Sequence, residues 1–410
     1  MTAEDQEATT LVTARQVLVD VHSTAIQNGG VLVSGEKIIA VGKETDISNL
    51  VDKDAKRLDL GNLTLLPGMI DCHVHLSYDT LQSRSHLIEN SLGEALLTTL
   101  MLYNARKLLT VGVTTIRELG SKKSLGSLVR DTILRGWASG PRILAANEPI
   151  TTTGGHAWFL GGECDSADEI RKSVRAHQKS TSDIVKIMVT GGGLTTGSMP
   201  WRPQFSLEEV QIAVTEATRL GMPVAAHVHG TDGIAIAARA GVKTLEHCTW
   251  MGPGGEIGQN LDEGIVDEIV KRGIFVCPTA SSRWDTMNHK RLSSKINTVS
   301  VMHKAGVRLI AGTDAGIEHV PHENYGQGLL WLRECGLSNE EVIASATSVA
   351  AEACGLSEIT GSLVVGKSAD MIAVRADPRS NLETLNQPVW VMARGKYIGT
   401  RERFEPFGLN

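Results

Sequence analysis

The sequence predicts an α/β fold in which a (β/α)8 TIM barrel carries a small β-sandwich domain formed by both ends of the chain. First, eight strand-like segments alternate with helical segments through the middle of the chain, which is typical of a parallel sheet and most simply of a closed barrel. Second, both ends of the chain are rich in β-forming residues. Third, no Gly-x-Gly-x-x-Gly follows the first strand of the middle region, which argues against the runner-up, an open doubly wound sheet.

The two ends of the chain are expected to combine into one β-domain that comprises residues 1–65 and 360–410. Both ends contain short β-rich runs separated by turn-forming pairs such as Gly29-Gly30 and Asp377-Pro378. The runs cover residues 11–21, 31–33, 37–41, 370–374, 389–392 and 396–398. Two similar ends around a different middle region are the pattern expected when a chain starts and finishes in the same domain.

The barrel is expected to span residues 66–359. The expected strands are residues 69–75, 112–118, 142–147, 183–190, 223–228, 243–248, 274–280 and 308–314. Three of the helices between them are expected to begin with a capping box, in which a serine and a glutamate three residues later satisfy free backbone donors. The boxes are Ser166 with Glu169, Ser206 with Glu209, and Ser338 with Glu341.

The composition is that of an ordinary globular protein, and it excludes several classes of function. A formal net charge of −6 and an aromatic content of 4% offer neither the positive field nor the stacking surfaces that nucleic acids require. The chain has no apolar run of about 18 residues, so no membrane-spanning helix is expected. The acidic start at residues 1–7 is unlike a secretory signal, and six scattered cysteines without a Cys-x-x-Cys motif favour a reducing compartment. We therefore expect a cytoplasmic protein without nucleic-acid or membrane partners.

The motif that organises the middle of the chain is the pair His73 and His75 at the end of the first expected barrel strand. Residues two apart on a strand point to the same face, so both imidazoles can bind one metal ion. By itself the pair is equally consistent with polar surface, and the remaining strands have to decide between these interpretations.

Four other expected strands also carry side chains that can bind metals. They are Lys186 within the fourth strand, His227 and His229 at the end of the fifth, His247 at the end of the sixth, and Asp314 at the end of the eighth. Catalytic groups of such barrels lie at the carboxyl ends of the strands. Each residue alone has a simpler explanation, such as a core histidine, a helix cap or a lysine that extends its charge to solvent. Their joint placement predicts a metal site.

A long glycine-rich loop at residues 191–202 follows the fourth expected strand. It lacks the Lys-Ser/Thr step of a Walker loop, so a phosphate cradle of that kind is excluded. We expect a mobile loop that covers the mouth of the barrel.

These residues resemble the metal-dependent amidohydrolase superfamily. The resemblance covers nearly the whole chain and rests on residues 67–75, Lys186, His227, His247, Asp314 and the return into the terminal domain at residues 361–370. The most similar branch holds Xaa-Pro dipeptidases, basic-residue carboxypeptidases, ochratoxin-type amidases and imidazolonepropionase-like proteins. Residues 112–118 and 152–156 also look like that branch, although Glu118 stands where an aspartate is more usual.

The resemblance implies a binuclear centre of two divalent metal ions, with zinc as the expected metal. The implied ligands are His73, His75 and Asp314 for one ion and His227 and His247 for the other. Lys186 would bridge both ions as an N-carboxylate derived from carbon dioxide, because burial favours the neutral amine that can add it. A metal-bridging hydroxide would attack an amide carbonyl, and Asp314 would pass the proton to the leaving amine.

The implied substrate is a small amide, either dipeptide-like or an N-acyl amino acid, with toxin and xenobiotic amides included. Candidate substrate contacts are His156, Arg202, His229 and Tyr325, and a homo-oligomer is expected from the resemblance. One alternative is a mononuclear deaminase or cyclic-amide hydrolase of the same superfamily, in which Lys186 stays an ammonium paired with Glu118 or Asp314. The other is a non-catalytic scaffold with the same fold.

Overall fold

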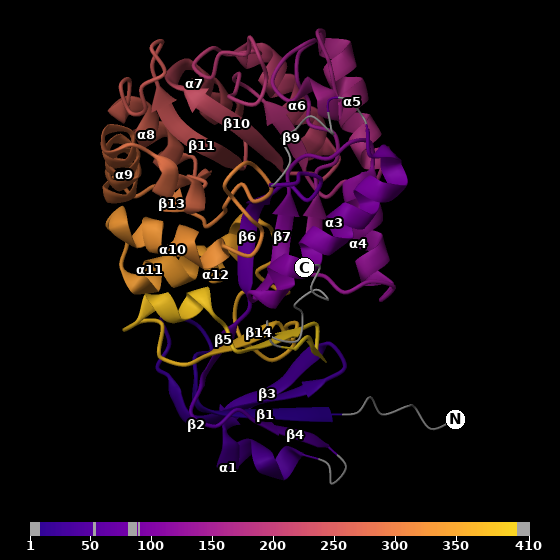
Figure 1. The fold of residues 1–410 in the computed structure, drawn as a ribbon, viewed down its shortest axis with the longest axis vertical. Coiled ribbons are helices and arrows are strands. Elements are labelled where there is room, and N and C mark those ends of the chain that lie inside the picture. Colours follow the sequence, from indigo (N-terminus) through magenta and orange to yellow (C-terminus); the bar gives the residue numbers. More distant parts are fainter. Residues whose placement is uncertain (1–8, 52–54, 81–87, 89–90, 400–410) are drawn as a thin grey trace, which may run out of the picture.

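The computed structural model describes residues 9–51, 55–80, 88 and 91–399. The chain forms a sheet from both of its ends and a larger α/β part, which lies above that sheet in Figure 1. Residues 1–8 and 400–410 of the predicted terminal domain, including the acidic start of the chain, lie outside the described residues.

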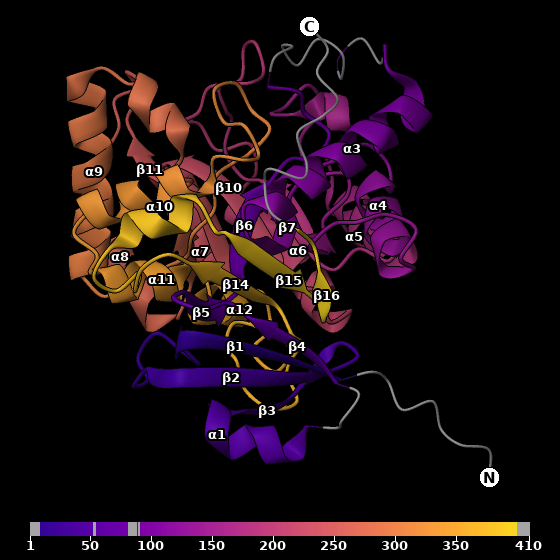
Figure 2. The same ribbon diagram turned by 60° about the horizontal axis from the view of Figure 1, so that its bottom comes forward.

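The two ends of the described chain meet in one eight-stranded sheet. Its strands are β1 (Thr9–Val17), β2 (Ile26–Ser34), β3 (Lys37–Lys43), β4 (Lys56–Asp59), β5 (Thr64–Pro67), β14 (Met371–Val374), β15 (Trp390–Ala393) and β16 (Lys396–Tyr397). Their order is β16-β15-β14-β5-β1-β2-β3, and β4 also pairs with β1. Because β14 lies antiparallel between β5 and β15, the C-terminal strands extend a sheet that the N-terminal strands begin (Figure 2).

The register of this sheet follows the burial of its apolar residues. Val12 on β1 pairs with Val31 on β2, and Leu65 on β5 pairs with Ala373 on β14. All four side chains are buried in one apolar cluster, which stabilises pairing between segments that are far apart in the sequence. The two-layer sandwich and its boundaries at residues 65 and 360 stay predictions.

In the described part of the middle region, eight strands run parallel in two sheets, which confirms the α/β class. The first sheet has the order β6-β7-β8, with β6 (Met69–Val74), β7 (Val113–Glu118) and β8 (Arg142–Ala145). The second has the order β13-β12-β11-β10-β9, with β9 (Val185–Met188), β10 (Val224–Gly230), β11 (Thr244–Met251), β12 (Phe275–Cys277) and β13 (Arg308–Leu309). Each strand overlaps one of the eight expected segments.

Backbone hydrogen bonds connect the two parallel sheets at both pairs of edge strands. Beyond β8, the N–H of Ile150 donates to the carbonyl of Lys186 on β9 at 2.8 Å. Beyond β13, the N–H of Asp314 donates to the carbonyl of His73 on β6 at 2.8 Å. The second contact brings two of the predicted metal ligands to the same end of the parallel strands.

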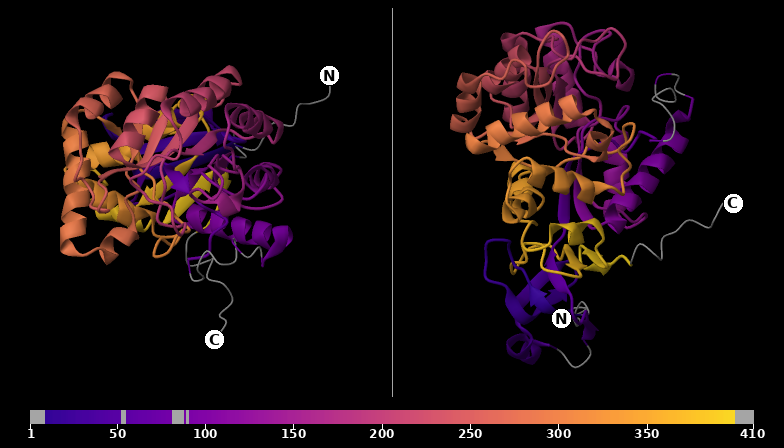
Figure 3. Two further views of the ribbon diagram at one scale, coloured as in Figure 1. Left: turned by 90° about the horizontal axis from the view of Figure 1, so that it is seen from above. Right: turned by 60° about the vertical axis from the view of Figure 1, so that its left-hand side comes forward.

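Helices lie around the parallel strands, as the view from above in Figure 3 shows. They are α3 (Gly93–Thr110), α4 (Leu125–Leu134), α5 (Ala167–Lys179), α6 (Leu207–Arg219), α7 (Thr231–Ala240), α8 (Glu263–Lys271), α9 (His289–Lys304), α10 (Tyr325–Glu334), α11 (Asn339–Ser345) and α12 (Ser348–Ala353). The shorter helices are α1 (Glu44–Ile47), η1 (Ser48–Leu50), η2 (Trp158–Leu160), η3 (Ser282–Thr286) and η4 (Leu382–Asn386). One large apolar cluster packs most of the long helices against the strands.

The three predicted helix starts are present, and two of them are complete capping boxes. Ser206 before α6 and Ser338 before α11 each accept from the backbone N–H three residues later, and the glutamates there accept in return. Before α5, Ser166 accepts from the N–H of Glu169, but the carboxylate of Glu169 accepts from the N–H of Asp165 instead. The carboxylate of Glu169 thus bonds to the backbone N–H of the residue before the helix cap, whereas in a complete capping box it would bond to that of the cap residue Ser166.

All six cysteines are free thiols, and the Sγ atoms of Cys72 and Cys354 lie 3.9 Å apart. Within the described ranges, no helix combines the length and apolar character needed to cross a membrane.

Candidate metal centre

Two histidines and an aspartate meet at the carboxyl ends of β6 and β13. The Nε2 atoms of His73 and His75 lie 3.4 and 3.2 Å from Oδ1 of Asp314, and the two rings are 5.2 Å apart. One potential ligand atom of each residue lies within 4.8 Å of the other two. Imidazole and carboxylate atoms grouped in this way are suited to binding one divalent metal ion.

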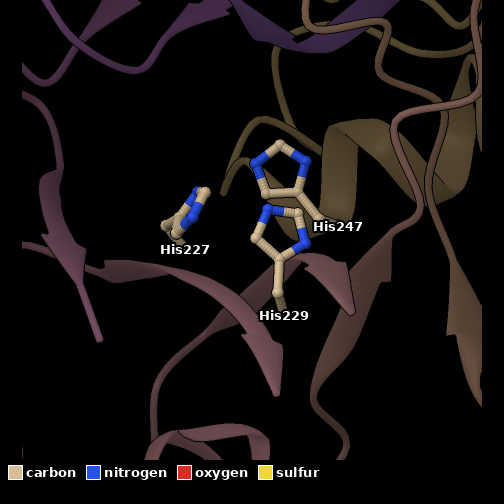
Figure 4. Close-up of side chains that lie close together, drawn as sticks. All are labelled: His227, His229 and His247. Atoms are coloured by element: carbon tan, nitrogen blue, oxygen red, sulfur yellow. The ribbon is translucent and has the colours of Figure 1, made fainter. Parts of the chain in front are cut away.

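A second group consists of three histidines on the neighbouring strands β10 and β11 (Figure 4). The ring centroids of His227 and His247 are 4.6 Å apart, and the rings of His229 and His247 stack at 4.7 Å. His247 also lies 5.0 Å from His73, so the two groups adjoin. His229, which the resemblance assigns to substrate contact and not to a metal ion, therefore lies in one group with two possible ligands.

Lys186 on β9 is the remaining predicted ligand, and it is buried close to both groups. Its side chain is 1% exposed, and within the described part of the chain its Nζ atom has no hydrogen-bond partner. The expected alternative, an ion pair of Lys186 with Glu118 or Asp314, is therefore absent. Burial lowers the pKa of Lys186 to about 8. An unpaired ammonium is costly to bury, and the lowered pKa makes the neutral amine of Lys186 far more accessible at neutral pH than that of an ordinary lysine.

His73, His227 and His247 are held in the neutral form that binds metals. Burial is the main cause, and it lowers the pKa of His73 to about 4 and that of His227 and His247 well below the usual range. The positive charge of Lys186 adds to each shift. Among the described residues, the buried atoms His73 Nε2 and His75 Nδ1 have no hydrogen-bond partner. Buried imidazole nitrogens without a protein partner fit a zinc-type ion.

A buried carboxylate orients His73. Glu246 on β11 accepts hydrogen bonds from His73 Nδ1 at 2.8 Å, from Arg117 at 2.6 Å and from the hydroxyl of Thr244 at 2.5 Å. Burial would raise the pKa of Glu246, but Arg117 and His73 lower it to about 2. The ionised carboxylate keeps a proton on Nδ1 and leaves Nε2 facing Asp314, which is how carboxylates support histidine ligands in metal sites.

The backbone around the ligands is fixed by Asp71 and contains strained residues. Asp71 accepts from the N–H and hydroxyl of Thr313 at 3.1 and 2.6 Å and from the N–H of His73 at 3.1 Å. His247 and Asp314 have φ angles of 67° and 65°, in the left-handed region that residues other than glycine rarely adopt. Such strain persists only where the surroundings enforce it, and it concentrates at functional sites.

Both ligand groups line a cavity of about 170 Å³. The loop at residues 191–202 contributes Gly193, Leu194 and Pro200 to its lining, which agrees with a loop at the mouth. His156 also lines the cavity and stacks on His227 at 4.5 Å. Mobility of the loop stays a prediction.

Two of the four predicted substrate contacts, His156 and His229, line the cavity, and two do not. Arg202 is exposed and lies outside the lining. Tyr325 is buried, and its hydroxyl donates to the carbonyl of Ile70 at 2.7 Å, so it joins α10 to β6 instead of reaching the cavity. The chain order placed both residues near the mouth, but side-chain direction and helix packing decided their positions.

The predicted site did not include Glu246 and Arg117, which support His73, or Lys295, which lines the cavity. Glu246 and Arg117 lie within otherwise apolar strand segments, and a charge in such a segment is a signal that a partner is buried with it. Lys295 lies on a helix that is polar around most of its surface, so nothing in the sequence indicates that its side chain points inward.

The model of the amidohydrolase family matches residues 64–398, a range that contains every predicted ligand. An ochratoxinase of Aspergillus niger is 25% identical over 421 aligned positions, which cover 94% of this chain and 85% of that protein. An imidazolonepropionase of Chloroflexus aggregans is 24% identical, with 92% of each chain covered. The crystal structure of a Xaa-Pro dipeptidase with methionine bound in its active site aligns with a TM-score of 0.84 at 27% identity, covering 95% of this chain and 99% of that chain. These matches confirm the resemblance stated from the sequence.

Proposed function

The chain belongs to the amidohydrolase family and is a hydrolase acting on C–N bonds, and from this premise we propose that it cleaves a small amide with a centre of two divalent metal ions. The observation that carries the proposal is the buried, unpartnered amine of Lys186 beside two groups of imidazoles. We also propose that the two parallel sheets form one closed (β/α)8 barrel with this centre at its carboxyl end. The hydrogen bonds between both pairs of edge strands support that closure.

The donor set suits zinc, which binds imidazole and carboxylate ligands in such sites. The proposed ligands are His73, His75 and Asp314 for one ion and His227 and His247 for the other. The neutral amine of Lys186 would add carbon dioxide, forming an N–C bond and releasing one proton, and the resulting carboxylate would supply an anionic ligand in the cavity that both groups line. When bound, two divalent ions lower the pKa of water and polarise the scissile carbonyl.

Asp314 is the proposed proton carrier of the reaction. Burial would raise its pKa, but the neighbouring His73 and His75 hold the pKa of Asp314 well below its usual range, so the carboxylate is ionised at neutral pH. An ionised carboxylate beside the reacting water can accept its proton and deliver it to the leaving amine. Glu246 is a positioning residue in this scheme, because it acts through His73.

The proposed substrate class is dipeptide-like amides and N-acyl amino acids, including toxins and xenobiotics with such a bond. It is supported by relatives named ochratoxinase and Xaa-Pro dipeptidase, the latter with an amino acid in its active site. The cavity also offers apolar surface for a side chain, from Met251, Ile257, Trp284 and Met287.

Metal analysis combined with an amide panel tests the proposal. Protein prepared with zinc and bicarbonate should contain two ions per chain and hydrolyse N-acyl amino acids or dipeptides, and a chelator should abolish the activity until zinc is returned. Full activity with one ion per chain would favour the mononuclear deaminase or cyclic-amide hydrolase instead. A chain that binds no metal and cleaves no substrate of the panel would favour the scaffold.

A further inference from the structure

One wall of the cavity carries three cationic side chains that the proposed reaction does not use. Arg283 belongs to η3, and Arg291 and Lys295 belong to α9. Of the described residues that line the cavity, Asp314 is the only carboxylate, and it already faces the histidines of β6. This cationic wall therefore has an excess of positive charge that no lining side chain balances.

Lys295 is the buried member of the cationic wall. Its side chain is 5% exposed and lies on the same face of α9 as the buried Val299 and Met302, four and seven residues later. Its Nζ atom lies 5.1 Å from the centroid of the Trp284 ring, in a cation–π contact. In the part of the chain that the structure describes, Lys295 forms no hydrogen bond or ion pair.

Lys295 keeps its charge at neutral pH. Burial lowers the pKa of this lysine to about 8, and repulsion from Arg291 and Arg283 contributes less. At pH 7 the ammonium form is still the major one. A buried ammonium is unfavourable without an anionic partner, and the ring of Trp284 compensates for only part of that cost.

The position of Lys295 connects the cationic wall to the metal ligands. Lys295 lines the same cavity as His229 and His247, and the rings of these two histidines stack at 4.7 Å. An amide held at the ligand groups can therefore extend toward Lys295 over the apolar side chains of Trp284 and Met287, which line the same cavity. A free carboxylate at that end of the molecule would supply the missing anion.

We propose that Lys295, assisted by the more exposed Arg283 and Arg291, binds a free carboxylate on the amine side of the scissile amide. The inference rests on the proposed amide hydrolysis and narrows its substrate class. The amine that leaves is then an amino acid with an ionised carboxylate, held by a charge-assisted hydrogen bond to the ammonium. Amides of neutral amines are poor substrates, because they leave Lys295 buried and unpaired.

Matched substrates that differ only in this charge test the proposal. The first pair is N-acetyl-L-phenylalanine and its C-terminal amide, and further pairs carry larger acyl groups. Each substrate is incubated with the zinc-loaded full chain, and the carboxylic acid set free from its acyl group is measured. The wild type should prefer the carboxylate by about 10- to 100-fold in kcat/KM, the usual size of a hydrogen bond to a charged group. Lys295→Met keeps the length of the side chain and should remove this preference through KM, with little change for the amide substrates.

Two further variants separate charge from fold. Lys295→Arg should retain part of the preference, and Lys290→Met, an exposed position on the same helix, should behave like the wild type. Lys295→Met should unfold at the wild-type temperature or above it, because it removes a buried charge. The proposal is overturned if Lys295→Met keeps the preference or slows both substrates of a pair equally.

A wild type that cleaves no member of any pair contradicts the proposed function and not the assignment of Lys295. Calorimetric titration with L-phenylalanine and L-phenylalaninamide then decides about Lys295 alone. If the wild type binds L-phenylalanine more tightly than L-phenylalaninamide and Lys295→Met loses this difference, the assignment is supported. Equal binding of both compounds to the wild type overturns it.

Discussion

The two ends of the cavity present different kinds of side chain to a ligand, imidazoles at the metal end and cations at the cationic wall. At the metal end, burial keeps His73, His227 and His247 neutral and leaves Lys186 without a partner. At the cationic wall, Lys295 is 5% exposed and lies over the ring of Trp284, and at pH 7 it is mostly an ammonium. Neutral donors attract cations, and a lone ammonium attracts an anion. The difference teaches that unsatisfied buried groups in one cavity can indicate two ligands of opposite charge.

The largest expected effect is at Lys186. Lys186→Ala removes the side chain proposed to carry the bridging carboxylate, so the chain should lose at least one metal ion and its activity should fall by ~10³-fold or more, as several kcal/mol of charge stabilisation are lost. Metal analysis and turnover of an N-acyl amino acid measure this, and added short-chain carboxylic acids should restore some activity. Lys179→Ala, an exposed position on α5, is the control. A fully active Lys186→Ala enzyme would remove the binuclear mechanism.

A somewhat smaller effect is expected at Asp314. Asp314→Asn keeps an oxygen ligand but cannot carry a proton, so turnover should fall by ~10²–10⁴-fold while most of the metal is retained. Turnover measured beside metal content separates the two roles of this residue. Near-wild-type turnover would show that another group moves the proton.

Glu246, which orients His73, is expected to affect the activity less than the proposed metal ligands do. Glu246→Gln removes the charge that orients the imidazole, so metal affinity should fall by about 10- to 100-fold, the usual cost of losing such a partner. Competition with a fluorescent zinc chelator measures the affinity, and the exposed Glu358→Gln serves as control. Unchanged metal affinity would show that Glu246 pairs with Arg117 but does not support metal binding through His73.

The smallest effect concerns the pH dependence of stability at the cationic wall. The pKa of Lys295 is about 8 when folded and near 10.5 when unfolded, so between these values the unfolded chain binds more protons and stability rises with pH. Lys295 should contribute up to about 1.4 kcal/mol per pH unit to that slope. Urea unfolding of metal-free protein at pH 8 to 10 measures it, and Lys295→Met should flatten the curve whereas Lys290→Met should not. An identical slope in all three proteins would contradict a buried ammonium.

The sequence by itself was enough to predict the order of the strands along the chain and a set of candidate metal ligands. His73 and His75 share a face because side chains on a strand alternate, and Asp314 joins them because parallel strands place their carboxyl ends together. These rules depend on local spacing, which a sequence displays directly. The predicted homo-oligomer and cytoplasmic location follow no such rule, and both stay predictions.

Only the tertiary structure decided which side chains complete the cavity. It placed His229 in one group with the candidate ligands His227 and His247, turned Tyr325 into the core to bond the carbonyl of Ile70, and directed Lys295 inward from a largely polar helix. Each outcome depends on how a helix or strand packs against residues far away in the chain. Local spacing carries no record of that packing, because burial and charge pairing are set by neighbours that meet only when the chain has folded.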